Sequence, residues 1–501
     1  MARPELCQPR SVVESAHDCG RRQAFPRCAG RSPGPPQVDP VQRMNILILG
    51  AGQVGSSAAQ QLAREEANEV TIVDLNEEVL RELQDRLDLR TVVGHAAYPD
   101  VLERAGANDA DIIVALTNSD ETNMIACQIA YTLFHTPTKI ARIRAAEYMQ
   151  ADKLFAQSSL PVDVRISPEQ LVCEYIAQLI QYPGAFQVLD FADGSVRLVG
   201  ARADRDGQLV GQKLKALKEH LPNAEGRIAA IYRDGKSVEP DGDTVVREGD
   251  EVFFIAARKD IRVFMGEMRR LEEPVRRVVI AGGGNIGFRL ARALEQTNQV
   301  KIIERDPGRA RQISERLAKA IVLVGDAADE ELLLEENIDN ADVFCALTNA
   351  EEANILSAML AKRLGAAKVM ALINRPSYAE LVESGNIDIA ISPQQVTIGS
   401  LLAHVRRGDV VRVHSLRRGA AEAIEAVAHG SEDGSRVVGK KIEEVELPKG
   451  TTIATIVRQG ELITPHHDTV IEADDHVILF MTDRRRIEAV EDLFQVGVSF
   501  L

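Results

Sequence analysis

Short apolar runs alternate with segments of helical periodicity in the first third of the chain. The spacing predicts helices over 53–65, 77–87, 101–105 and 123–134, and strands over 45–49, 69–74, 91–93, 112–116 and 139–143. Strands that are apolar throughout are typical of a sheet covered on both faces. Their alternation with helices predicts an α/β fold with a parallel, doubly wound sheet of the Rossmann type.

The same pattern occurs a second time, with strands expected over 278–281, 300–304, 321–324, 343–347 and 368–372. Three motifs repeat in the same order: NILILGAGQVG (45–55) and RVVIAGGGNIG (277–287), TNSDETN (117–123) and TNAEEAN (348–354), ISPEQ (166–170) and ISPQQ (391–395). The separation of matching positions changes only from 232 to 225 residues along the copies. We therefore predict a tandem duplication of one structural unit.

Each copy has a longer N-terminal part and a shorter C-terminal part that ends in a Gly-Asp or Asp-Asp turn and a strand. We expect four domains: Rossmann-like N-lobes at 44–165 and 275–393, and small α+β C-lobes at 184–268 and 410–494. Residues 1–43 are rich in Pro, Arg and Cys and show no periodicity. We expect them to be a disordered extension, or translated sequence upstream of a functional start at Met44.

A glycine triplet, Gly50-x-Gly52-x-x-Gly55, follows the first strand and opens the first helix. Asp74 ends the next strand, 19 residues after Gly55. In this context Gly50 makes a tight turn, Gly52 lets backbone N–H groups approach a pyrophosphate, and Gly55 lets the helix lie close to the sheet. Asp74 would accept hydrogen bonds from the hydroxyls of an adenosine ribose.

The second copy repeats this fingerprint as Gly282-x-Gly284-x-x-Gly287, with Glu304 as the acidic residue. The alternative is that the glycines serve only packing. A carboxylate at the ribose repels a 2′-phosphate, so the pattern favours NAD-type ligands over NADP.

Polar residues follow the fourth strand of each copy, at Thr117-Asn118 and Thr348-Asn349. They could contact adenosine, or one of them could cap the following helix. Arg142, on the fifth strand, could reach a phosphate, and Ala371 stands at the matching place in the second copy. We therefore expect the two sites to differ.

Charge and hydropathy exclude several classes of partner. The net charge of −16 and a pI of about 5.3 give no electrostatic basis for binding nucleic acid or anionic lipid. The sequence contains no run of eighteen apolar residues, so direct membrane insertion is not expected.

The cysteines are few and isolated, as in a reduced cytosol. No His, Lys or Cys recurs near both glycine triplets, which argues against an enzyme, and the histidines around 466–476 align with a plain loop rather than a metal site.

The order of these motifs from Met44 to Leu501 resembles the TrkA family, cytosolic regulatory subunits of bacterial Trk potassium uptake built from two RCK units. The resemblance implies a ring of chains, peripheral on the inner face of the membrane, that gates a Trk-type membrane potassium transporter subunit and binds NAD(H) or an adenine nucleotide such as ATP or ADP. It implies a non-enzymatic function; an NAD-dependent oxidoreductase and a nucleotide-sensing scaffold for another transporter are the alternatives. The contacts it implies are Gly50, Gly52, Gln53, Val54, Gly55, Asp74, Thr117 and Arg142 in the first copy, and Gly282, Gly284, Asn285, Ile286, Gly287, Glu304 and Thr348 in the second.

Overall fold

The structure is a computed structural model. It describes residues 43–65, 68–156, 158–375, 377–378, 382, 387–405, 409–416, 421–431, 434–482 and 486–495, all within one unit that begins at Arg43. The extension expected over 1–43 lies outside the described residues except for Arg43.

The first N-lobe is a sheet of six parallel strands in the order β3-β2-β1-β4-β5-β6. This confirms the predicted Rossmann-type sheet, because the strand order reverses between β1 and β4, and such a switch point is where ligands bind in doubly wound sheets. The strands are β1 (Met44–Leu49), β2 (Asn68–Asp74), β3 (Arg90–Val93), β4 (Ile112–Ala115), β5 (Thr138–Arg142) and β6 (Val164–Ile166). The helices are α1 (Gln53–Leu62), α2 (Glu77–Gln84), α3 (Pro99–Arg104), α4 (Asp120–Ile129), α5 (Ala146–Met149) and α6 (Pro168–Gln181).

The second N-lobe repeats this sheet in the order β14-β13-β12-β15-β16-β17. Its strands are β12 (Arg277–Ala281), β13 (Gln299–Glu304), β14 (Ile321–Val324), β15 (Val343–Ala346), β16 (Lys368–Leu372) and β17 (Ile389–Ile391). Its helices include α9 (Asn285–Leu294), α10 (Pro307–Ser314), α11 (Glu330–Glu335), α12 (Glu351–Arg363) and α14 (Pro393–Val405). The sixth strands, β6 and β17, were not predicted; each has only three residues, too few for a clear pattern.

Each C-lobe contains a five-stranded sheet whose neighbouring strands are antiparallel, in the orders β10-β9-β11-β8-β7 and β18-β19-β22-β20-β21. The first comprises β7 (Ala185–Phe191), β8 (Val196–Arg202), α7 (Leu217–His220), β9 (Gly226–Arg233), β10 (Lys236–Val238), β11 (Glu251–Ala257) and α8 (Ile261–Met268). The second comprises β18 (Val410–Leu416), β19 (Ala421–Val427), β20 (Thr451–Arg458), β21 (Glu461–Ile463), β22 (His476–Met481) and α15 (Ile487–Phe494). The C-lobes are therefore α+β, as expected.

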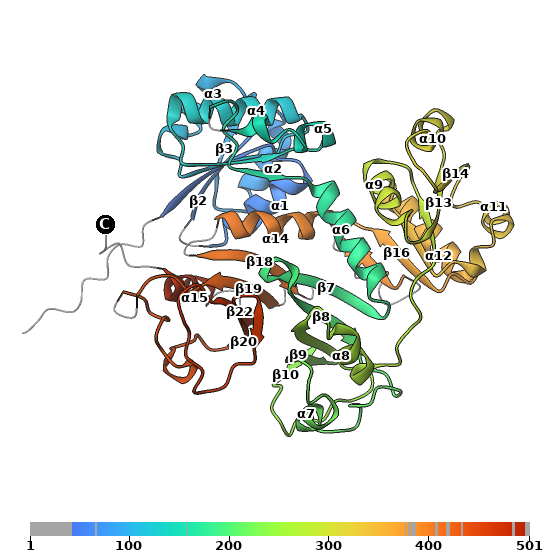
Figure 1. The fold of residues 1–501 in the computed structure, drawn as a ribbon. Coiled ribbons are helices and arrows are strands. Elements are labelled where there is room, and N and C mark those ends of the chain that lie inside the picture. Colours follow the sequence, from blue (N-terminus) through green and yellow to red (C-terminus); the bar gives the residue numbers. More distant parts are fainter. Residues whose placement is uncertain are drawn as a thin grey trace, which may run out of the picture. The chain divides into compact units, whose positions relative to one another are not determined.

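The two copies exchange their cores. Helix α14, which links the second N-lobe sheet to its C-lobe, packs against α1 of the first N-lobe, and α6, which links the first N-lobe sheet to its C-lobe, packs against α9 of the second (Figure 1). One apolar cluster accordingly joins the first N-lobe to the second C-lobe, and another joins the second N-lobe to the first C-lobe. Neither copy buries a complete core by itself.

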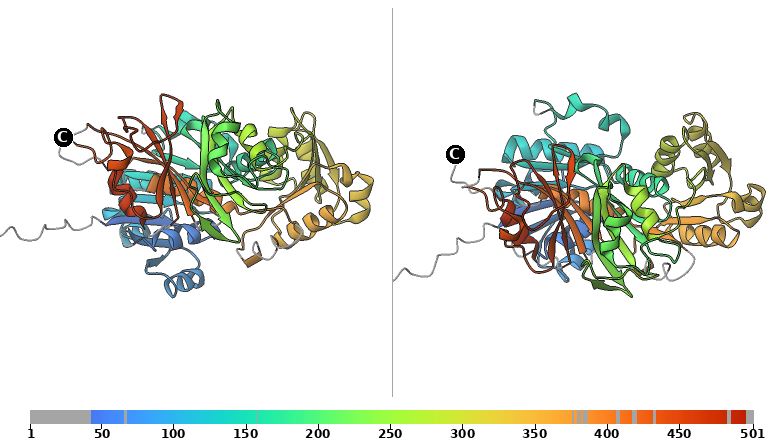
Figure 2. Two further views of the ribbon diagram at one scale, coloured as in Figure 1. Left: turned by 90° about the horizontal axis from the view of Figure 1, so that it is seen from below. Right: turned by 60° about the horizontal axis from the view of Figure 1, so that its bottom comes forward.

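The two C-lobe sheets share a further apolar cluster, which includes Phe191 and Phe253 from the first and Leu416 and Phe480 from the second. The two sheets, in green and red, lie side by side in both views of Figure 2. The folded unit is thus held together by contacts between copies as well as within them.

Candidate functional site

The glycine turn between β1 and α1 has the geometry that the fingerprint requires. Gly50 has a φ of 103°, and a Cβ there would lie 3.0 Å from the backbone nitrogen of Thr117. A Cβ on Gly55 would lie 1.9 Å from the carbonyl oxygen of Gly50, whereas one on Gly52 would meet nothing within 4 Å. Gly50 and Gly55 therefore close the turn, and Gly52 leaves its outer face open for a ligand.

Asp74 is fixed at this turn by two backbone hydrogen bonds. Its Oδ2 accepts from the N–H of Ala51 at 2.6 Å, and its Oδ1 accepts from the N–H of Asn76 at 2.8 Å. An ionised carboxylate has about four acceptor positions, so each oxygen keeps capacity for a further donor. This arrangement leaves a carboxylate with open acceptor positions at the end of β2. We call this turn with its carboxylate the first crevice, and its counterpart in the second copy the second crevice.

The second copy builds the same crevice with a longer acid. Gly282 has a φ of 102°, and a Cβ on Gly287 would lie 2.0 Å from the carbonyl oxygen of Gly282. Glu304 Oε2 accepts from the N–H of Gly283 at 2.7 Å, and its Oε1 accepts from Asp306 at 2.9 Å. A Cβ on Gly284 would meet nothing within 4 Å, so this turn is open at the same place.

The remaining residues that the family resemblance implies as nucleotide contacts lie at the starts of α1 and α9, and they are of two kinds. Gln53 and Asn285 are the first residues of α1 and α9 and are exposed, so their N–H groups lie at the positive ends of the helices. The side chains of Val54 and Ile286 pack against the two exchanged cores. Only the backbone of Val54 and Ile286 is therefore suited to a ligand.

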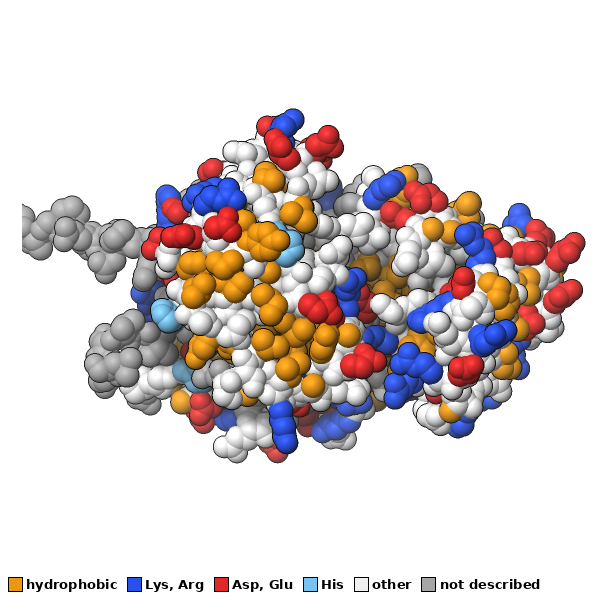
Figure 3. All heavy atoms as spheres, turned by 90° about the horizontal axis from the view of Figure 1, so that it is seen from above, with side chains coloured by type: hydrophobic (Ala, Val, Ile, Leu, Met, Phe, Trp, Pro, Cys, Tyr) orange, Lys and Arg blue, Asp and Glu red, His pale blue; other side chains and the backbone are white. Residues whose placement is uncertain are grey.

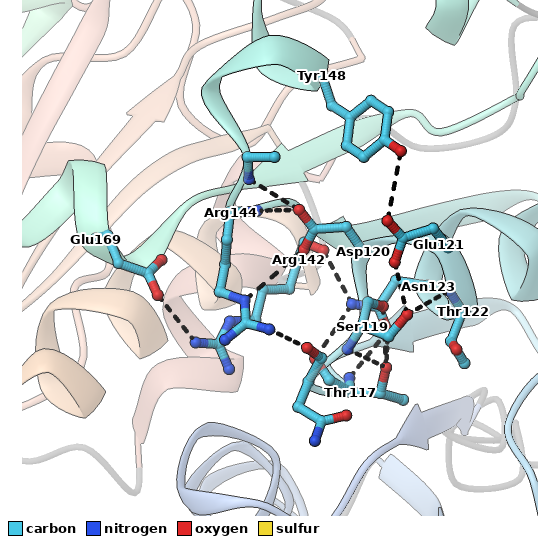
Figure 4. Close-up of polar contacts among 12 residues, drawn as sticks. Thr117, Ser119, Asp120, Glu121, Thr122, Asn123, Arg142, Arg144, Tyr148 and Glu169 are labelled. Carbon is cyan, nitrogen blue, oxygen red and sulfur yellow. Dashed lines mark hydrogen bonds and ion pairs between the residues drawn. The ribbon is translucent and has the colours of Figure 1, made fainter. Parts of the chain in front are cut away.

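Thr117 lies in the loop between β4 and α4, and hydrogen bonds through Asn123 link this loop to the end of β5 (Figure 4). Its N–H and hydroxyl donate to Oδ1 of the fully buried Asn123, at 3.0 and 2.7 Å, while Nδ2 of Asn123 donates to the carbonyl of Arg142 at 2.9 Å. The alternative that Thr117 or Asn118 caps the following helix is wrong. The cap of α4 is Ser119, whose side chain accepts the N–H of Thr122. Contact between Thr117 and adenosine stays a prediction.

The second copy repeats this loop with Thr348 and Asn354. Nδ2 of Asn354 donates to the carbonyl of Leu372, as Asn123 does to that of Arg142. The strand registers agree, since Ala115 pairs with Ala141 and Ala346 pairs with Ala371. The counterpart of Arg142 is therefore Leu372, and the expected match to Ala371 is wrong by one residue. The expectation that the second copy lacks a cation here still holds.

Arg142 lies against a carboxylate supplied by α6. One of its terminal nitrogens is 3.3 Å from Oε1 of Glu169, and both side chains are largely buried (Figure 4). Nε of Arg142 and Oε2 of Glu169 are buried and have no hydrogen-bond partner. The guanidinium thus keeps donor capacity toward an anion, but in this structure its charge is shared with Glu169.

The comparisons with known proteins bear on this pair of crevices. A model of the TrkA-N domain matches residues 46–168 and 278–393, and a model of the TrkA-C domain matches residues 198–268 and 432–495. The Trk system potassium uptake protein TrkA of Halomonas elongata is 59% identical over 91% of this chain and 100% of its own length. That of Vibrio alginolyticus is 57% identical over the same shares.

The chain belongs to the TrkA family. Solved structures agree on the fold: the GsuK RCK domain aligns with a TM-score of 0.58 at 17% identity, covering 90% of this chain and 95% of that one. The GsuK channel bound to NAD aligns with a TM-score of 0.57 at 18% identity, covering 90% and 79%. The expected two tandem RCK units are confirmed, and neither the relatives nor these structures are named for the oxidoreductase alternative.

Sequence reasoning missed a polar group beside the crevice of this TrkA-family chain. Oδ2 of the buried Asp120 accepts the N–H groups of Arg144 and Ala145, and the Arg144 guanidinium lies 3.8 Å from its Oδ1 (Figure 4). Glu121 accepts from Ser119, and backbone and Ser119 hydrogen bonds hold its pKa below the ordinary value. The alternation Arg142-Ile-Arg144 at a strand end was the available signal.

Two features are absent from the described part of the chain. It holds no group of three or more His, Cys, Asp or Glu side chains placed to bind a metal ion. His476 instead lies 2.6 Å from the buried Glu425. None of its helices combines the length and apolar character needed to cross a bilayer.

Proposed function

We propose that this TrkA-family chain is the nucleotide-sensing subunit of a potassium uptake system, and that NAD(H) binds at both glycine turns, with ATP or ADP as a competing ligand of the same sites. The observation that carries the proposal is the duplicated turn, in which an open glycine stands beside a carboxylate held by backbone N–H groups. A family member of similar length in Halomonas elongata is named for potassium uptake, and the structurally similar GsuK channel has been solved with NAD.

The chemistry of each crevice is binding rather than turnover. The N–H groups at the start of α1 and α9 suit a pyrophosphate, and the carboxylates of Asp74 and Glu304 suit ribose hydroxyls. NAD(H) would supply the adenosine and pyrophosphate groups that these elements recognise. The expected partners are a Trk-type membrane subunit and further copies of this chain, on the cytoplasmic face of the membrane.

The exchanged cores give a nucleotide a route to the C-lobes. A ligand at the first turn touches the start of α1, α1 packs on α14, and α14 packs on β18 of the second C-lobe. A ligand that binds two arrangements of these elements with different affinity shifts their populations, and about 1–3 kcal/mol of such coupling is typical of allosteric proteins.

Replacing Asp74 or Glu304 with arginine should separate the two sites. Each substitution removes the ribose acceptor and the bonds that fix its turn, so we expect Asp74→Arg to lose NADH binding at the first crevice only and Glu304→Arg at the second only. Calorimetric titration with NADH, NAD and ATP would give one remaining site in each variant. If both variants bind all three ligands as the wild type does, the ribose assignment is wrong, and steady oxidation of NADH with a small substrate would favour the oxidoreductase instead.

Ring assembly has a candidate surface on the same helix of both N-lobes. Ile125 on α4 is 47% exposed, and its counterpart Leu356 on α12 is 62% exposed. Tyr131, Leu133 and Met359 extend these faces, and Figure 3 shows apolar side chains gathered over the first N-lobe, on the left of the view. We propose that copies of the chain meet through these faces, because burial of large apolar side chains stabilises association by about 1.5–3 kcal/mol each.

The double substitution Ile125→Glu and Leu356→Glu should lower the mass of the assembly. Light scattering of the purified full chain is the measurement, and Leu334→Glu, at a 53% exposed position on α11, is the matched control. An unchanged mass for the double variant would remove α4 and α12 from the interface.

A further inference from the structure

A cleft of about 900 Å³ lies between the first and second N-lobes and adjoins the second glycine turn at Asn285. The first N-lobe contributes the loops that follow β4 and β5, together with Gln170 of α6. The second contributes the outer face of α9, with Phe288, Arg289 and Arg292, and the arginines Arg309 and Arg316 on and after α10. A cleft of this size is large enough for a small-molecule ligand.

The four arginines of the second N-lobe have no carboxylate partner within 4 Å among the described residues. Arg289 donates to the carbonyl of Arg144 at 2.6 Å and to Oε1 of Gln170 at 3.2 Å. Arg309 donates through Nε to the carbonyl of Gly283, and Arg316 lies 4.7 Å from the centre of the Phe288 ring. Neutral acceptors and an aromatic face position these side chains without neutralising them.

The opposite wall supplies only part of the opposing negative charge. It carries Asp120, Glu121 and Glu147. Asp120 is occupied by backbone N–H groups and Arg144, and Glu121 accepts from Ser119 and Tyr148. Five arginines thus line the cleft with three carboxylates, in a chain whose net charge is −16.

The fold itself does not require three of these arginines. In the first copy, the positions of Arg289, Arg292 and Arg309 are occupied by Ser57, Gln60 and Val79, and the same Rossmann lobe forms. Gathering uncompensated cations around one cleft costs electrostatic free energy unless an anion joins them. The guanidinium group is planar and presents paired donors that match phosphate oxygens.

We propose that this cleft is a binding site for a polyphosphate group, held by Arg289, Arg292, Arg309 and Arg316 and bridging the two N-lobes. The site adjoins the second crevice, because Asn285 lines it, but it extends beyond both dinucleotide crevices, since neither Gly52 nor Gly284 lines it. The phosphates come either from a nucleoside triphosphate seated in the neighbouring second crevice, whose helix start Asn285 borders the cleft, or from a free polyphosphate.

The test is calorimetric binding of sodium tripolyphosphate and of ATP to the full chain at low ionic strength. The key variant is Arg289→Ser with Arg292→Gln, which installs the residues of the first copy. We expect the affinity to fall about a hundredfold, since each charge-assisted hydrogen bond contributes roughly a factor of ten or more. Wild-type binding should also weaken as salt is raised.

A double variant that removes the same charge elsewhere, Arg86→Gln with Arg311→Gln, is the control and should bind as the wild type does. If thermal melting shows that the key variant is misfolded, Arg309→Val replaces it. This substitution also installs the residue that the first copy has at that position. Failure of both tripolyphosphate and ATP to bind the wild type, or equal losses in key variant and control, would overturn the proposal.

The variant Gly284→Ala distinguishes the two sources of phosphate. If ATP binding requires both Gly284 and Arg289, the polyphosphate is the tail of a nucleotide in the second crevice. If tripolyphosphate binds Gly284→Ala as it binds the wild type, the ligand is a free polyphosphate. NADH binding measured in parallel keeps a failure here distinct from a failure of the dinucleotide sites.

Discussion

Replacing Gly55 with alanine should abolish nucleotide binding at the first crevice and lower the free energy of unfolding by about 3 kcal/mol. The added Cβ would lie 1.9 Å from the carbonyl oxygen of Gly50, and that atom belongs to the backbone of a closed turn. Since no side chain can rotate away, α1 must move off the sheet. The movement would also disturb α14, which packs on α1.

Gly52→Ala is the matched control for this effect, because a Cβ there meets nothing within 4 Å. We expect Gly52→Ala to unfold at the same urea concentration as the wild type but to bind NADH more weakly, through contact with the ligand alone. Urea unfolding and NADH titration on both variants give the comparison. Equal stability of Gly55→Ala and wild type would show that the turn is not as closed as this geometry requires.

The crevices were predictable because their determinants are local. The determinants are a strand, a turn with two closing glycines, and an acid at the end of the next strand. They lie close together in the sequence, and the glycines can be read directly as positions where a side chain would clash. Asp74 and Glu304 both lie where that logic puts them, each hydrogen-bonded to the residue after the first glycine. The duplication strengthened the prediction, since the same set occurs twice.

The exchange of cores between copies was not predictable from pattern. Helices α6 and α14 have the same place in their copies and similar apolar faces, so periodicity does not say which N-lobe each will cover. The pairing of Arg142 with Glu169 on α6 joins residues 27 apart within the first copy, and no local pattern states it. The π-helical turn Ala130–Phe134, which continues α4 within the expected 123–134 helix, was likewise invisible to a 3.6-residue period.

The chain has two kinds of functional feature. The first kind is the glycine turn with its acid, which depends on neighbouring residues and occurs in both copies. The second kind is the set of contacts between copies, which could transmit the effect of a bound ligand. Arg289 of the second N-lobe is of the second kind, because it donates hydrogen bonds to Gln170 and to the carbonyl of Arg144 in the first copy. The copies therefore differ at this contact, where Ser57 and Gln60 stand at the positions of Arg289 and Arg292.

The junction of the C-lobes gives a second large effect, on stability as a function of pH. His414 on β18 lies with Nε2 3.1 Å from the carbonyl oxygen of Asp190 and its ring against Phe191, on the other C-lobe. The pKa of His414 is lowered to about 4, chiefly by burial; the hydrogen bond to the Asp190 carbonyl opposes this shift, and the nearby Arg412 adds a smaller lowering effect. The first copy has Leu189 at the corresponding position, so the group occurs on one side of the junction only.

Between an unfolded pKa near 6.5 and the folded value of about 4, the unfolded chain binds a proton that the folded chain does not. The free energy of unfolding should therefore fall by roughly 2–3 kcal/mol as the pH drops through this window, and be unaffected by His414 above it. His414→Gln keeps an N–H donor for Asp190 but cannot titrate, so its stability should decline less over the same range. Urea unfolding at pH 7, 5.5 and 4.5 measures the difference, with the exposed His467→Gln as control. Parallel losses in wild type and His414→Gln would mean that the imidazole is not excluded from water at the junction.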